Sequence, residues 1–133
     1  MKNFLSHSLP VLLLMGCAST PSYRDLTPAQ RELYDRVRIL EGPAARRHET
    51  LGRVEALSCR RNLYFGSATR EEAREGVRVR AARLGADGVK NLRCRRAGIS
   101  LTRNCWASVT CAGFAVRFDP TDTTTVWDLP PGS

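Results

Sequence analysis

Four cysteines between residues 59 and 111 constrain the fold of this chain more than any other feature of its 133 residues. In a small domain exported to an oxidising compartment, such a set indicates two disulfides. A zinc site is less well supported, because no pair has the Cys-x-x-Cys spacing and His48 is the only histidine after His7. Four cysteines allow three pairings, and the spacing alone does not choose among them. The residues are Cys59, Cys94, Cys105 and Cys111.

The first residues, 1–16, have the pattern of an export signal. Lys2 precedes a short apolar run, which is far from the roughly 20 apolar residues of a membrane-spanning helix. The tripeptide Leu-Met-Gly directly before Cys17 resembles the bacterial lipobox, after which the cysteine is acylated and becomes the new N-terminus. A buried core helix is the alternative, but nothing upstream is present to pack against it. Cys17 is therefore the predicted lipid-attachment site.

Lipidation also predicts where the protein resides. Two or more acyl chains hold a protein firmly on a bilayer without any spanning helix. In lipoproteins of this kind an aspartate directly after the lipidated cysteine signals retention in the inner membrane. Here Ala18 and Ser19 follow Cys17. The predicted location is thus the outer membrane, with the protein anchored through acyl chains and facing the periplasm.

The rest of the chain divides into three predicted parts. Residues 17–35 form the lipidated cysteine and a short tether, because residues 18–28 are rich in Ser, Thr and Pro. Thr27-Pro28 predicts the start of a brief helix towards Tyr34. Residues 36–118 form one domain, and residues 119–133, rich in Asp, Thr, Pro and Gly, form a disordered tail.

A helix over residues 70–84 is the clearest element. Thr69 and Glu72 have the spacing of a capping box, and Gly85 supplies a C-terminal stop. The apolar residues at helical spacing are mostly small, so we expect this helix to lie close to a sheet. They are Ala73, Val77, Ala81 and Leu84.

Strand patterns surround this helix. Alternating or continuous apolar stretches, bounded by turn residues, occur over residues 37–40, 51–59, 89–94 and 105–118. The resulting order is β-β-α-β-β. It predicts an α+β domain in which an antiparallel sheet carries one main helix on a face.

A net charge of +8, nearly all from arginine, favours anionic partners. Nucleic acid is an improbable partner for an exported protein, which leaves lipid phosphates, lipopolysaccharide or acidic glycans. A GC-rich genome explains an arginine excess equally well. The candidate residues for anionic or partner binding are Arg70, Arg74, Arg78, Arg93, Arg95 and Arg96.

Catalysis has little support in the sequence. No G-x-S-x-G nucleophile motif and no phosphate-binding glycine loop is present. His48 lies in a basic, polar stretch that is more typical of a solvated turn than of a catalytic base. We therefore predict a protein that is not an enzyme and that needs no cofactor or metal.

Residues 80–111 read RAARLGADGVKNLRC, a short loop and NCWASVTC. They resemble the RcsF family, outer-membrane lipoproteins that sense stress for the Rcs phosphorelay, and the similarity covers about residues 52–116. The resemblance implies interleaved disulfides, Cys59–Cys105 and Cys94–Cys111. It also implies sensing of envelope damage by contact with outer-membrane proteins and an inner-membrane regulator. The alternative is a non-signalling envelope lipoprotein that binds anionic envelope components through its arginines.

Overall fold

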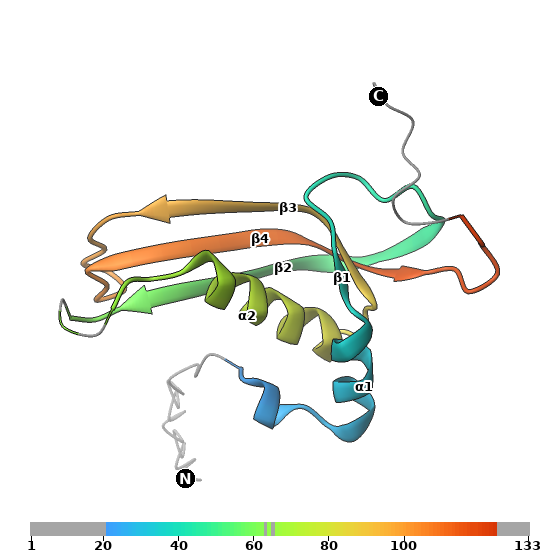
Figure 1. Cartoon of the computed structure of the whole chain (residues 1–133), viewed down its shortest axis with the longest axis horizontal. Helices are drawn as coiled ribbons and strands as arrows, with labels where there is room; N and C mark the ends of the chain where they lie inside the picture. Colours follow the sequence, from blue (N-terminus) through green and yellow to red (C-terminus); the bar gives the residue numbers. More distant parts are fainter. Residues whose placement is uncertain (1–20, 63, 65, 125–133) are drawn as a thin grey trace, which may run out of the picture.

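The computed structural model describes residues 21–62, 64 and 66–124 (Figure 1). The predicted signal peptide, the lipid-attachment site Cys17 and residues 125–133 lie outside the described residues. Within the described part, no helix has the length and apolar character needed to cross a membrane.

A four-stranded sheet forms one layer, and the main helix α2 packs across one of its faces (Figure 1). The α+β class with one main helix on the sheet, predicted from the sequence, is confirmed. The central strand β4 pairs antiparallel with both β2 and β3. The strands, in the spatial order β1-β3-β4-β2, are β1 (Arg38–Ile39), β2 (His48–Arg60), β3 (Gly88–Ala97) and β4 (Ala107–Phe118).

The sequence predicted an antiparallel sheet, whereas the observed sheet is mixed because one pair of strands is parallel. The two residues of β1 run parallel to β3, with Arg38 opposite Gly88. β1 follows helix α1 (Pro28–Arg36) and β3 follows helix α2 (Arg70–Arg83), and the two helices pack together. Both strands therefore enter the sheet from the same end, which makes their pairing parallel.

Helix α2 forms where the periodicity predicted it. The Thr69 hydroxyl accepts the N–H of Glu72 at 3.2 Å, and Gly85 ends the helix with a φ of 80°. A positive φ costs glycine little, which explains the stop. Leu84, the last residue of the predicted stripe, is 49% exposed because the helix has already ended at Arg83.

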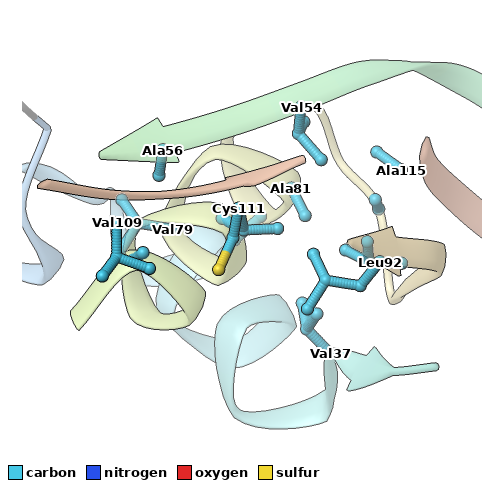
Figure 2. Close-up of a cluster of buried hydrophobic side chains, with 14 of the residues drawn as sticks. Val37, Val54, Ala56, Val79, Ala81, Leu92, Val109, Cys111 and Ala115 are labelled. Carbon is cyan, nitrogen blue, oxygen red and sulfur yellow. The ribbon is translucent and has the colours of Figure 1, made fainter. Parts of the chain in front are cut away.

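The core lies between α2 and the sheet (Figure 2). Small residues allow the close approach that the sequence predicted: a Cβ added to Gly76 of α2 would come 2.7 Å from the Cβ of Ala56 in β2. Leu92 and Val77 are the largest fully buried side chains. Other members of this core are Val54, Ala56, Ala73, Val79, Ala81, Val109, Cys111 and Ala115.

The folded region begins earlier than the predicted boundary at residue 36. A 3-10 turn, Tyr23–Asp25, and helix α1 both lie in the stretch assigned to the tether. Thr27 caps α1 as expected, and Leu26 is only 3% exposed. Burying an apolar side chain favours order, so this segment packs as part of the domain.

Among the described residues, a second group of buried apolar side chains lies at one end of the opposite face of the sheet. Leu40, Val116 and Phe118 form a second small core there. The first residues of the predicted disordered tail are held nearby, since the guanidinium of Arg46 donates to the Asp119 carbonyl at 2.6 Å. Hydrogen bonds from Thr124 and from the Arg47 backbone lower the pKa of Asp122 to about 2.

Candidate functional site

Two disulfides brace the sheet, Cys59–Cys105 and Cys94–Cys111. This is the interleaved pairing that the family resemblance implied. Cys94 on β3 lies opposite Cys111 on β4, and their disulfide links these two neighbouring strands. Cys59–Cys105 ties the end of β2 to the loop that leads into β4. The described residues contain no cluster of three or more His, Cys, Asp or Glu that would bind a metal.

The loop over residues 98–106, which joins β3 to β4, is a tight hairpin tip. Ser100 and Cys105 exchange two backbone hydrogen bonds, at 2.8 and 3.0 Å. Asn104 has a φ of 51°, a conformation that asparagine tolerates better than most residues. With Cys105 also bonded to Cys59, this loop has a fixed shape.

Apolar side chains project from this fixed loop. Leu101 is 91% exposed, Ile99 64% and Trp106 48%. Sequence reasoning did not single out this tip, although the pair of aliphatic residues between Gly98 and Asn104 was a signal for it. Exposed apolar side chains gathered in one place indicate an interaction site more often than isolated ones do.

The connection between β2 and α2 lies at the same end of the sheet (Figure 1). Arg60, the last residue of β2, is paired with Ala107 at the start of β4. The Trp106 backbone N–H also donates to the Arg60 carbonyl at 2.7 Å. Tyr64 in this connection is 92% exposed. We call residues 61, 62, 64 and 66, together with residues 98–106, the loop end of the domain.

Three of the six candidate arginines, Arg93, Arg95 and Arg96, lie on β3 and are exposed. Because β1 pairs only with the start of β3, this part of β3 is an edge of the sheet. Within the described residues none of the three forms an ion pair, and residues 88–118 contain no aspartate or glutamate. Charged side chains on an edge also discourage strand-to-strand aggregation, which is their simplest role.

The other three arginines lie on α2 and contact the domain itself. Arg70 and Arg74 both bind the Glu41 carboxylate, at 3.0 and 2.8 Å. The Arg78 guanidinium lies over the Tyr34 ring, 5.5 Å from its centre. The six arginines therefore do not form one surface, and those of the helix are already engaged by acidic or aromatic groups.

Glu72 joins the start of α2 to the end of β2. Its carboxylate accepts hydrogen bonds from Arg60 at 2.8 Å and from the Ser58 hydroxyl. These contacts, with Arg60 the stronger, lower the pKa of Glu72. The Ser58 hydroxyl in turn accepts the Thr69 backbone N–H at 3.0 Å. Only half of the predicted capping box forms, because Ser58 takes the N–H that Glu72 was expected to bind.

His48 begins β2 and has both ring nitrogens engaged. Nδ1 lies 2.7 Å from the Arg46 carbonyl and Nε2 lies 2.8 Å from the Lys90 ammonium. A carbonyl only accepts and an ammonium only donates, so Nδ1 carries the proton and Nε2 accepts. This arrangement fixes the ring in a structural role at the end of the sheet.

No protein-family model matches this chain, and no curated protein does either. Among solved structures, one similar chain is a protein of unknown function from Pediococcus pentosaceus that belongs to the DUF74 family. The two are 17% identical with a TM-score of 0.47, and the match covers 61% of this chain and 96% of the other. A likeness at this level carries no argument about function.

Proposed function

We propose that this chain is a lipid-anchored, RcsF-like protein of the outer membrane that faces the periplasm, senses envelope stress and signals by protein–protein contact. The observation that carries the proposal is the pair of interleaved disulfides, Cys59–Cys105 and Cys94–Cys111. Disulfides persist in oxidising compartments such as the periplasm and are rare in the cytosol. They support export, and their pairing agrees with what the resemblance implies.

The shape of the domain suits recognition. Cys59–Cys105 and the hydrogen bonds of Ser100 with Cys105 fix the loop end before any partner arrives. A preformed surface binds with a smaller loss of conformational entropy than a flexible one. The partners expected from the resemblance are outer-membrane proteins and, under stress, an inner-membrane regulator.

The anchor is tested by mass spectrometry of the native protein extracted from membranes, with Cys17→Ser as the control. We expect an acylated peptide that begins at Cys17 and two disulfide-linked peptide pairs with the observed connectivity. The Cys17→Ser variant should remain in the soluble envelope fraction. An unmodified Cys17 in a soluble protein would refute the anchored function.

Signalling is tested separately with photo-crosslinking residues at positions 99 and 101 of the anchored chain. The proposal expects crosslinks to envelope proteins that change when the outer membrane is damaged. A crosslinker at position 38, at the far end of the sheet, provides the control. Crosslinks that are the same at both ends, or unchanged by damage, would contradict a sensing role.

Binding of anionic envelope components is a second candidate function. The uncompensated arginines of β3 favour it, whereas Arg70 and Arg74 share an ion pair with Glu41. If this function is correct, it belongs to the loop end and the edge strand rather than to helix α2.

A further inference from the structure

We propose that the loop end docks on the surface of an anionic phospholipid bilayer, with Ile99, Leu101 and Trp106 entering the interface. This rests on the second candidate function and deepens it by naming its ligand and its surface. It is the alternative to a protein contact at the same loop end, and it predicts that crosslinkers at positions 99 and 101 reach lipid and not envelope proteins. It does not depend on the acyl chain at Cys17, which would attach the protein without orienting the domain.

The exposed apolar side chains of the loop end lie on a rigid hairpin tip. Leu101 is 91% exposed on a hairpin tip that the Ser100–Cys105 hydrogen bonds and the Cys59–Cys105 disulfide hold in place. Leu101 is thus presented to solvent even though burial would be favourable. Trp106 lies at the base of the same tip, half exposed, and tryptophan is enriched where membranes meet water.

Uncompensated positive charge lies beside and within this tip. Arg95 and Arg96 lie on β3 shortly before the tip, Arg103 lies within it and Arg61 lies in the neighbouring loop; all four are exposed. Within the described residues no carboxylate forms an ion pair with any of them. A cluster of uncompensated arginines attracts anionic headgroups and binds phosphates through charge-assisted hydrogen bonds.

The arrangement of the two kinds of side chain favours a bilayer over a protein partner. Ile99 and Leu101 are exposed in the hairpin tip together with Arg103, and Arg95 and Arg96 lie farther back along the strand. A bilayer presents its layers in the matching order, phosphates outside and acyl chains within. A protein hot spot usually consists of apolar anchors that fill fitted pockets in the partner. Single projecting side chains enter a bilayer without such pockets.

Trp106 provides the readout. Trp127, the other tryptophan of the chain, is replaced by phenylalanine (Trp127→Phe), so that the fluorescence comes from Trp106. The full lipidated chain with this substitution is incorporated into vesicles with brominated acyl chains. In vesicles that contain phosphatidylglycerol we expect quenching and a blue shift of Trp106 fluorescence. Vesicles of phosphatidylcholine alone, or high salt, should reduce both because the arginines lose their anionic partners or are screened.

Variants separate the apolar and the basic contributions. Leu101→Asp should abolish quenching. Arg95→Gln with Arg96→Gln should lower the ratio of docked to free domain by roughly 30-fold, from about 1 kcal/mol per arginine near a charged membrane. The matched controls, Arg38→Gln and Leu84→Asp, change exposed residues away from the loop end and should leave quenching unchanged.

The outcomes distinguish docking from anchoring. Flotation of the protein with the vesicles at high salt reports the acyl anchor, whereas quenching of Trp106 reports docking. Flotation with no quenching in any lipid would overturn docking and leave the anchor intact. Quenching that is independent of lipid charge, or unaffected by Leu101→Asp, would also overturn it. Protection of Trp106 by an envelope protein with no quenching by lipid would assign the loop end to a protein partner instead.

Discussion

Gly76 allows helix α2 to lie directly on strand β2. A Cβ at this position would come 2.7 Å from the Cβ of Ala56, well inside the 3.4–4 Å of ordinary contacts. On a free helix, Gly76→Ala would stabilise by about 1 kcal/mol through helix propensity. Here the added methyl overlaps a second methyl, and overpacking a core costs about 1–3 kcal/mol. We expect Gly76→Ala to leave stability unchanged or lower it by up to about 2 kcal/mol.

Ala56→Gly tests the cause of this loss. On its own it removes a buried methyl and places glycine in a strand, and both effects lower stability. In the Gly76→Ala/Ala56→Gly double variant, the new methyl occupies the space that the old one has left. The loss in the free energy of unfolding of the double variant should therefore be smaller than the sum of the two single losses by about 1–3 kcal/mol, which is the cost of overpacking.

Thermal and urea unfolding, followed by circular dichroism with both disulfides intact, measure this coupling. One kcal/mol corresponds to a Tm change of roughly 4–8 °C in a domain of this size. Gly42→Ala serves as the control, because a Cβ there meets nothing within 4 Å and should show no coupling to Ala56→Gly. Additivity of Gly76→Ala and Ala56→Gly within about 0.5 kcal/mol would refute the close contact.

Two other predictions concern the disulfides and Glu72. Replacing both cysteines of Cys59–Cys105, separated by 46 residues, with alanine should cost about 4 kcal/mol in urea unfolding. The same change to Cys94–Cys111, separated by 17, should cost about 3 kcal/mol, and a loss below about 1 kcal/mol for either would contradict the bracing role. Glu72 has a pKa below its ordinary value of 4.5, so its contribution is complete above that pH and is lost as the pH falls through the lowered pKa. The Tm difference between wild type and Glu72→Gln should therefore shrink on acidification, and a difference that stays constant with pH would show that the carboxylate contacts add no stability.

Local patterns predicted the elements that local interactions form. The apolar spacing of residues 73–81 and the Thr69 cap were sufficient for α2, because helix periodicity and capping act within a few residues. The small size of the stripe residues also predicted the close approach to the sheet. The strands were predicted in their observed places for the same reason.

Contacts between distant segments were not predictable in this way. The pairing of β1 with β3 depends on how α1 packs against α2, and no local pattern encodes that packing. Leu26 was assigned to a tether because its neighbours are polar, yet it is buried by residues far along the chain. The incomplete capping box has the same origin: Ser58, on another element, binds the Thr69 N–H in place of Glu72.

The arginines show most clearly why a binding surface needs tertiary information. Their spacing made Arg70, Arg74 and Arg78 a basic row, but Glu41, separated by 29 and 33 residues from the first two, forms ion pairs with both of them. Arg95 and Arg96 have no comparable pattern, yet the fold leaves them uncompensated on an edge strand beside exposed apolar residues. Because attraction to an anionic surface depends on uncompensated charge, the docking surface that we propose lies at the loop end of the sheet and not on the helix. The experiment with Trp106 therefore tests two arginines that the sequence did name, Arg95 and Arg96, at a surface that only the fold defines.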